Sequence, residues 1–369
     1  MLNNLLVGNG VTIQFGGLDY SNKKIIKRAR NNLYTGTYPD KLYHFDTILY
    51  FENLFENVPA ILKGDYDSYT AGIRKGSLDH FKNRYSGWKN IKLYDVGLED
   101  YFLIHFLVSN RFKVFNPERY IITQSIKMML VDSIYNGGKI QELYKNYSEN
   151  FINYLNTFQN VFTTNYDQNL EIASSSSVHY LHGAFHILAE VYNPDSFRNR
   201  LADNQFMKNG LTNPEGFEHL HSTALMAYSG EDKEFLTEYP DIANHGIEKL
   251  VEGYKTNLTI KNDIDQWKYA ESSLVRNAYS AIMLKLKEDV EFQTTDSFNN
   301  FEEIEGELQI LGLSPENDNH IFSRINENSK ITRIVYYYFN EDDKKAAQAV
   351  FENGILVLKS VQNFWKTYS

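Results

Sequence analysis

The sequence predicts an α/β fold in which one parallel β-sheet is interrupted by two large helical insertions. Short apolar runs alternate with helical segments, most clearly in the last part of the chain. The run at residues 331–339 is almost continuously apolar, which is typical of a strand buried on both faces of a parallel sheet. Several apolar runs end directly in Gly, Asn or His, where strands of such sheets lead into ligand-binding loops.

The composition is that of a packed globular protein. The chain has 369 residues, of which 42% are hydrophobic and 15% aromatic, so it can bury a sizeable core. Its formal charge of −10 argues against a polyanion as the main ligand, and we expect no direct nucleic-acid binding. No apolar run has the length of a membrane span and no signal peptide is evident, so we expect a soluble, cytoplasmic protein. There is no cysteine, which excludes disulfides, a cysteine nucleophile, iron–sulfur clusters and cysteine-based zinc sites.

The first expected strand, at residues 5–7, leads into Gly8, Asn9 and Gly10. A glycine turn after a strand is how α/β folds bring backbone N–H groups and a helix N-terminus to a pyrophosphate. The segment departs from the G-x-G-x-x-G fingerprint because Ile13 occupies the third glycine position. A tight turn without a ligand is the alternative interpretation.

The other elements follow in chain order. Residues 18–159 are expected to be mostly helical, with apolar stripes that form a core at residues 98–109, 121–134 and 140–155. The elements expected beyond the central strands are a polar loop and helix at 193–213, a strand at 223–228, helices at 231–238, 242–254 and 269–286, a polar loop at 256–267, a strand at 307–311, a helix opened by residues 316–320, a strand at 331–339 and a final helix at 343–361. One discontinuous domain results, with its sheet at about residues 1–19, 156–192, 220–230 and 305–369, and with helical insertions at about 20–155 and 231–304.

Two short apolar runs in the middle of the chain each end in polar side chains. Residues 161–164 are followed by Asn165 and Asp167, and residues 178–181 by His182 and Gly183. Two such strand ends so close in the chain predict one site at one edge of the sheet. The serine run at 174–177 between them is interpreted as a flexible loop or a lid.

Gly8, Asn165, His182 and Gly312 each follow an apolar run, so we expect all of them at the same edge of one sheet. There is no G-x-S-x-G elbow for acyl transfer. The set suits cleavage at an anomeric carbon whose leaving group departs neutral, such as nicotinamide from NAD+, because that bond needs no general acid. His182 would accept a proton from a ribose hydroxyl or from the attacking water. Asn165 would hold the water or the ribose, and Asp167 would orient the site or offset developing positive charge.

Two other interpretations of the histidines remain open. In the first, His182 is a core histidine bonded to the backbone. In the second, His179, His182 and His186 bind a metal from one face of a helix. The strand-like run at 178–181 argues against the second interpretation, because His179 and His182 would point to opposite faces of a strand.

Several motifs together carry a family resemblance. They are G-N-G at residues 8–10, T-T-N-Y-D at 163–167, L-H-G at 181–183 and G-L-S-x-x-x-D-x-H at 312–320. This combination resembles the sirtuin-like NAD-hydrolase family of bacterial anti-phage defence, which is also similar to the AbiH-type abortive-infection proteins. T-T-N-Y-D is similar to the sirtuin T-Q-N-x-D, and L-H-G to the sirtuin catalytic His-Gly. The resemblance covers the sheet edges and not the helical insertions.

The resemblance implies a Rossmann-like, sirtuin-like domain that hydrolyses NAD+ to nicotinamide and ADP-ribose and so depletes cellular NAD+ during abortive infection. It implies Asn165 and His182 as the catalytic pair. The residues expected near the dinucleotide are Gly8, Asn9, Gly10, Thr12, Thr164, Gly183, Gly312, Ser314 and Asp318.

The chain departs from sirtuin deacylases because it lacks their four-cysteine zinc module and the G-I-P-x-F-R that follows their glycine loop. Both departures argue against deacylation and leave hydrolysis, with NAD+ as the substrate, water as the acceptor and no zinc or further cofactor. No nucleotide-sensing second domain is evident, so we expect control by a partner such as a HerA-like ATPase or by assembly into a homo-oligomer. Two other functions remain open: a catalytically silent subunit that binds NAD+ or ADP-ribose in a defence complex, and a nucleotidyl or ADP-ribosyl transferase.

Overall fold

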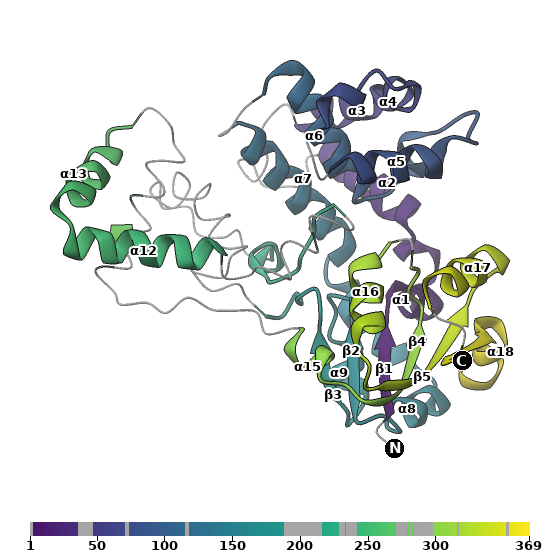
Figure 1. The fold of residues 1–369 in the computed structure, drawn as a ribbon. Helices are drawn as coiled ribbons and strands as arrows, with labels where there is room; N and C mark the ends of the chain where they lie inside the picture. The colour runs from purple at the N-terminus through teal and green to yellow at the C-terminus, as the bar shows by residue number, and fades with distance from the viewer. Residues whose placement is uncertain are drawn as a thin grey trace.

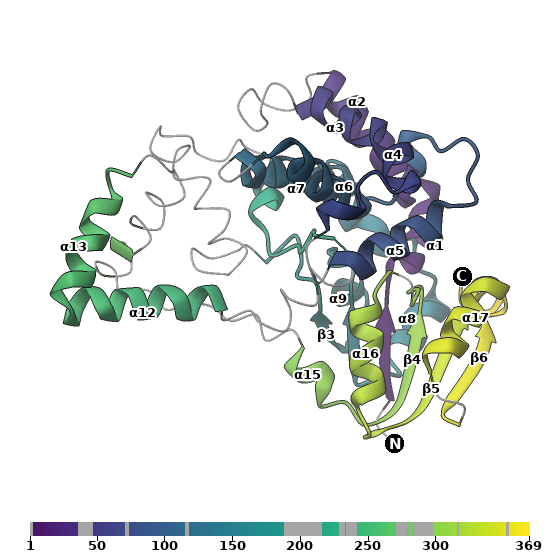
Figure 2. The same ribbon diagram turned by 45° about the horizontal axis from the view of Figure 1, so that its top comes forward.

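The computed structural model confirms the α/β class, with a six-stranded sheet in which every strand pair is parallel. The strands lie in the order β3-β2-β1-β4-β5-β6 (Figures 1 and 2), which is the strand order of Rossmann-type dinucleotide-binding folds. Their bounds are β1 Asn3–Val7, β2 Asn160–Thr163, β3 Ser177–Tyr180, β4 Gly306–Leu311, β5 Ile331–Tyr338 and β6 Leu356–Ser360. The structure describes residues 3–35, 47–70, 74–114, 118–187, 216–228, 233, 242–270, 279, 282–283, 286, 298–315, 317–351 and 354–369.

Helices cover both faces of this sheet. Leu5 and Val7 of β1 pack on one face, together with α1 (Asn9–Gly16), α8 (Glu149–Leu155) and α18 (Val361–Tyr368). Leu6 packs on the other face, where the covering helices are α15 (Asn299–Glu302), α16 (Asn319–Glu327) and α17 (Glu341–Val350). Successive side chains of a strand point to opposite faces, so both faces of β1 are buried.

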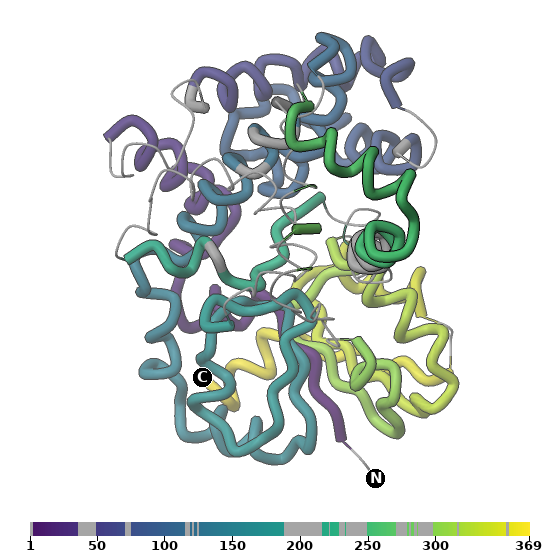
Figure 3. Tube along the Cα trace, turned by 90° about the vertical axis from the view of Figure 1, so that its left-hand side faces the viewer, coloured from purple at the N-terminus to yellow at the C-terminus, as the bar shows by residue number. Residues whose placement is uncertain are grey.

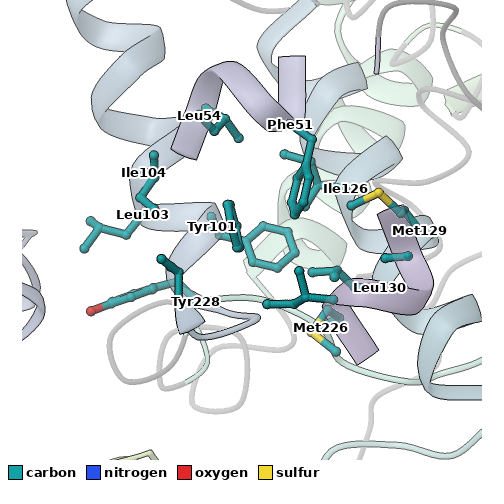
Figure 4. Close-up of a cluster of buried hydrophobic side chains, with 14 of the residues drawn as sticks. Phe51, Leu54, Tyr101, Leu103, Ile104, Ile126, Met129, Leu130, Met226 and Tyr228 are labelled. Atoms are coloured by element: carbon teal, nitrogen blue, oxygen red, sulfur yellow. The ribbon is translucent and has the colours of Figure 1, made fainter. Parts of the chain in front are cut away.

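The first insertion, between β1 and β2, is a helical layer at the carboxyl edge of the sheet (Figures 1 and 2). Tyr166 and Phe185, which follow β2 and β3, belong to the same apolar core as this layer. Met226 and Tyr228 join that core beside Tyr101 and the helical side chains around it (Figure 4). The helices of the layer are η1 Gly17–Tyr20, α2 Asn22–Tyr34, α3 Thr47–Glu56, α4 Val58–Lys63, η2 Asp67–Tyr69, α5 Arg74–Tyr85, η3 Leu93–Asp95, α6 Asp100–Phe112, α7 Glu118–Tyr135 and η4 Lys139–Asn146.

The second insertion, between β3 and β4, contains α12 (Ile242–Thr256) and α13 (Leu258–Trp267). These helices pack on each other through Val251 and Ile264. They lie apart from the sheet, as Figures 1 and 2 show, and α12 is seen nearly end-on in Figure 3. Among the described residues, no helix combines the length and apolarity that crossing a bilayer requires.

Some expected elements are wrong. Residues 223–228 form no strand of the sheet. Most of the expected loop at 256–267 is helical, because residues 258–267 form α13, whose first turn is capped by the side chain of Asn257. The expected helix at 140–155 is divided into η4 and α8, because Ser148 caps a new helix by accepting a hydrogen bond from the amide of Phe151. The expected final helix at 343–361 is interrupted by β6, since the apolar run before residue 360 pairs with β5. Residues 193–213 lie outside the described residues, as do most of 231–238 and of 269–286.

Candidate functional site

The loops that the sequence predicts to converge leave the sheet side by side at its carboxyl edge. Val7 is level with Thr163 and Leu311, and Thr163 is level with Tyr180. The ladder continues past the strand ends, because Thr164 donates its amide hydrogen to the carbonyl oxygen of Val7 at 3.1 Å. The segments that begin at Gly8, Thr164, Leu181 and Gly312 are therefore neighbours, as predicted.

The loops after β1 and β4 touch through their glycines. The amides of Gly8 and Gly10 donate to the carbonyl oxygens of Leu311 and Gly312, both at 3.0 Å. A Cβ atom on Gly10 would lie 2.6 Å from the Cα of Gly312. Gly312 itself has a φ of +76°, a conformation that glycine adopts at little cost. The close approach of two backbones thus accounts for these glycines, and the β4 loop holds two amides that the sequence assigned to a pyrophosphate.

Asn165 ties the loop after β2 to the loop after β1. Its side-chain Nδ2 donates to the carbonyl oxygen of Gly8 at 3.3 Å. Its backbone amide donates to Oγ1 of Thr163 at 3.0 Å, which turns the chain sharply at the end of β2. The Asn165 side chain is only partly buried, so it borders the edge of the sheet without being part of the core.

Asp167 is a buried carboxyl group at the start of α9 (Asn169–Ala173), with 2% of its surface exposed. Its Oδ1 accepts hydrogen bonds from the backbone amide of Asn169 at 3.1 Å and from the side-chain amide of Asn169 at 2.6 Å. Its Oδ2 has no hydrogen-bond partner in the described part of the chain. Burial raises the pKa of Asp167 to about 6, although Asn169 and the Thr12 hydroxyl act in the opposite direction.

His182 forms a buried pair with His320, a residue 138 positions further along the chain in the first turn of α16. The two Nε2 atoms are 2.9 Å apart, and both residues are 2% exposed. Burial lowers the pKa of His182 well below 6.5, and the positive charge of Lys233 lowers it further. Burial likewise lowers the pKa of His320 to about 3, with Lys233 and Arg324 acting in the same direction. Both imidazoles are therefore neutral at pH 7.

Gly183 is required by the turn that follows His182. Its φ is +72°, and a Cβ atom there would lie 2.1 Å from the carbonyl oxygen of Thr223. The amide of Leu225 donates to the carbonyl oxygen of His182 at 2.8 Å. Residues 223–228, expected as a strand, instead pack across the loop that holds His182.

A partly buried ion pair close to the histidines was not predicted. The Nζ of Lys233, whose side chain is 4% exposed, contacts Oε1 of Glu99 in the first insertion. Burial lowers the pKa of Lys233, but the Glu99 carboxylate more than offsets this, so the pKa is raised and the lysine is charged. Glu99 and Lys233 are far apart in the sequence and carry no motif, so no pattern could have paired them. His320, in contrast, is the last residue of the motif at 312–320.

Asp318, at the N-cap position of α16, makes no side-chain hydrogen bond to the helix. Burial raises its pKa to about 6, and Lys233 opposes this shift. Ser314 turns the chain into α16, because its carbonyl oxygen accepts from the amides of Asn317 and Asp318 at 3.2 and 3.3 Å. Asn9 is exposed, with Nδ2 donating to the carbonyl oxygen of Tyr20 at 3.3 Å, whereas Thr12 is buried and Thr164 is half-buried.

The three histidines near β3 have separate partners. His179 stacks on Phe162, His182 bonds His320 and His186 pairs with Glu171. His179, His182 and His186 therefore do not face a common centre at which they could bind a metal. The imidazole of His182 bonds a second imidazole and not the backbone. The serine run at 174–177 is anchored at the amino end of β3, where Ser176 donates to the carbonyl oxygens of Leu155 and Phe158, so it cannot be a lid over the opposite edge.

Comparison of the chain with models of known protein families, with curated proteins and with solved structures finds no match.

Proposed function

We propose that this protein is an NAD+ glycohydrolase that cleaves NAD+ to nicotinamide and ADP-ribose and acts in anti-phage abortive infection. The observation that carries the proposal is the convergence of the segments at residues 8–10, 164–167, 181–183 and 312–320 at one edge of the sheet. In sheets with this strand order, the crevice beyond the carboxyl ends of the strands is where dinucleotides bind. The same segments carry the motifs that resemble the sirtuin-like NAD-hydrolase family.

The side chains at this edge suit the chemistry of the nicotinamide–ribose bond. Nicotinamide leaves as a neutral molecule, so no general acid is required, and the sugar passes through an oxocarbenium-like state. His182 is neutral and would accept a proton from the ribose or from water. Asn165 would hold the ribose or water by hydrogen bonds, and the carboxylate of Asp167 would oppose the positive charge that develops on the sugar.

The test is product analysis with purified protein and NAD+, with and without a candidate partner such as a HerA-like ATPase. Nicotinamide and ADP-ribose should appear in equal amounts, and His182→Ala should lower the rate by at least about 100-fold. His80→Ala, which removes an exposed histidine from α5, is the matched control and should retain the wild-type rate. Wild-type turnover by His182→Ala would remove His182 from the mechanism, and transfer of label to a macromolecule would indicate a transferase.

A second candidate is a silent subunit that binds NAD+ or ADP-ribose without turnover. It is favoured by the engagement of this edge with itself, since His182 bonds His320 and the amides of Gly8 and Gly10 bond the β4 loop. Saturable binding of NAD+ with no product under every condition, with or without the partner, would support this candidate over the hydrolase.

A further inference from the structure

The His182–His320 pair imposes opposite tautomers on its two rings. A neutral imidazole carries one N–H and one lone pair. A hydrogen bond between two Nε2 atoms at 2.9 Å therefore requires that one ring carries its proton on Nε2 and the other on Nδ1. Within the described residues, Nδ1 of His320 is buried and has no hydrogen-bond partner. His182 has no partner on its own Nδ1 in the described part of the chain, so its only side-chain hydrogen bond is the one to His320.

We propose that His320 is a positioning residue for His182 in the proposed hydrolysis: it accepts a hydrogen bond from Nε2–H of His182 and leaves Nδ1 as the nitrogen that takes up the proton. This inference rests on the proposed function. In the step, the oxygen of water bonds to the anomeric carbon, and the bond to nicotinamide breaks with its electron pair on nicotinamide. The proton of the water moves to Nδ1 of His182 and is later released to solvent.

The pairing would also stabilise the cation that this step creates. A protonated His182 keeps its Nε2–H on the lone pair of His320, and a hydrogen bond with one charged partner is stronger than one between neutral groups. In hydrolytic triads a carboxylate holds the base in this way. Here a neutral ring takes that place, with Lys233 and Glu99 from one side and Asp318 and Arg324 from the α16 side as the surrounding charges. A neutral partner raises the pKa of the base less than a carboxylate would, so His182 stays unprotonated before substrate binds.

Two substitutions separate positioning from packing. In His320→Gln the side-chain carbonyl oxygen can accept the hydrogen bond from His182, whereas His320→Phe keeps the ring volume and removes the acceptor. We expect His320→Phe to lower kcat by about 10- to 100-fold with KM for NAD+ changed less than about threefold, and His320→Gln to keep kcat within about tenfold of wild type. A packing role predicts the reverse order, since Phe fills the site better than Gln. Wild-type kcat in His320→Phe would overturn the proposal.

Imidazole ¹⁵N NMR of the whole protein tests the same inference without turnover. The spectrum should show His182 with its proton on Nε2 and His320 with its proton on Nδ1, with assignments made from the His182→Ala and His320→Phe variants. The opposite tautomers would overturn the positioning role even if NAD+ is hydrolysed. The expected tautomers in a protein that releases no nicotinamide would mean that the proposed function fails while the pairing stands.

Discussion

The carboxyl edge of the sheet has two halves that are built in opposite ways. Between β1 and β4 the edge is closed by backbone, with the amides of Gly8 and Gly10 bonded to the β4 loop. Beside β2 and β3 the edge is lined by titratable side chains. Two of these, Asp167 and His320, keep a buried polar atom that has no hydrogen-bond partner among the described residues. An unpaired buried polar atom lowers the stability of a fold by about 1–3 kcal/mol. The half beside β2 and β3 is therefore less stable than it could be, and a functional role of its side chains is the expected reason.

The largest effect on stability is expected from a substitution in the half of the edge between β1 and β4, where the glycines lie. Gly312→Ala places a Cβ atom 2.9 Å from the Cα of Gly10 and 3.0 Å from the amide nitrogens of Gly10 and Val11, at a φ of +76°. Backbone atoms cannot move aside as a side chain can, so the free energy of unfolding should fall by about 2–5 kcal/mol. Denaturant unfolding measures this loss.

The matched control for Gly312→Ala is Gly87→Ala, where an added Cβ meets nothing within 4 Å and φ is not positive. This substitution should change the unfolding free energy by less than about 1 kcal/mol. Equal stability of the two alanine variants would mean that the loops after β1 and β4 do not approach each other as closely as described.

An intermediate effect on stability is expected from Asp167, in the half of the edge beside β2 and β3. Its pKa is about 6 in the folded protein against an ordinary value of 3.8, so the folded state retains a proton that the unfolded state releases. Stability should therefore fall by about 3 kcal/mol as the pH rises from about 4 to about 6, with the loss complete above that range. Asp167→Asn stays uncharged and can still accept the hydrogen bonds from Asn169, so it should lack this part of the fall.

The measurement is the unfolding free energy of wild type and Asp167→Asn between pH 4 and 7. Asp318 has a raised pKa in the same range, but it is present in both proteins and cancels in the difference. Asp263→Asn, at an exposed position on α13, is the control and should follow the wild-type curve. Parallel curves for wild type and Asp167→Asn would show that Asp167 is not buried as a carboxyl group.

The smallest expected effect on stability is at the junction of the two halves. Asn165→Ala loses one partly buried hydrogen bond, of 3.3 Å, to Gly8, so the unfolding free energy should fall by about 1 kcal/mol. Under the proposed function the rate of nicotinamide release should fall by about 100-fold or more, because a donor at the reacting ribose is lost. The exposed Asn90→Ala is the control for both measurements. A loss of stability without loss of rate would assign Asn165 to the loop junction alone.

Much of the sheet follows from local pattern. The strands β1 to β5 are predicted within a few residues, because buried parallel strands are apolar runs that end in turn residues. The pattern fails at β6, where a short apolar run near residue 356 is compatible with either a helix or a strand and only pairing with β5 decides. It also fails at residues 223–228, which have the composition of a strand but no neighbouring strand to pair with in the described sheet.

The same division applies to the candidate site. Amino-acid order is sufficient to bring Gly8, Asn165, His182 and Gly312 to one edge, because the direction of parallel strands places all their carboxyl ends together. It is not sufficient to pair His182 with His320 or Glu99 with Lys233, since these contacts join segments more than a hundred residues apart. Their burial and partners, and hence their charge states, arise only when the helical insertion and α16 pack against the edge, because desolvation and neighbouring charges depend on distance in space and not along the chain.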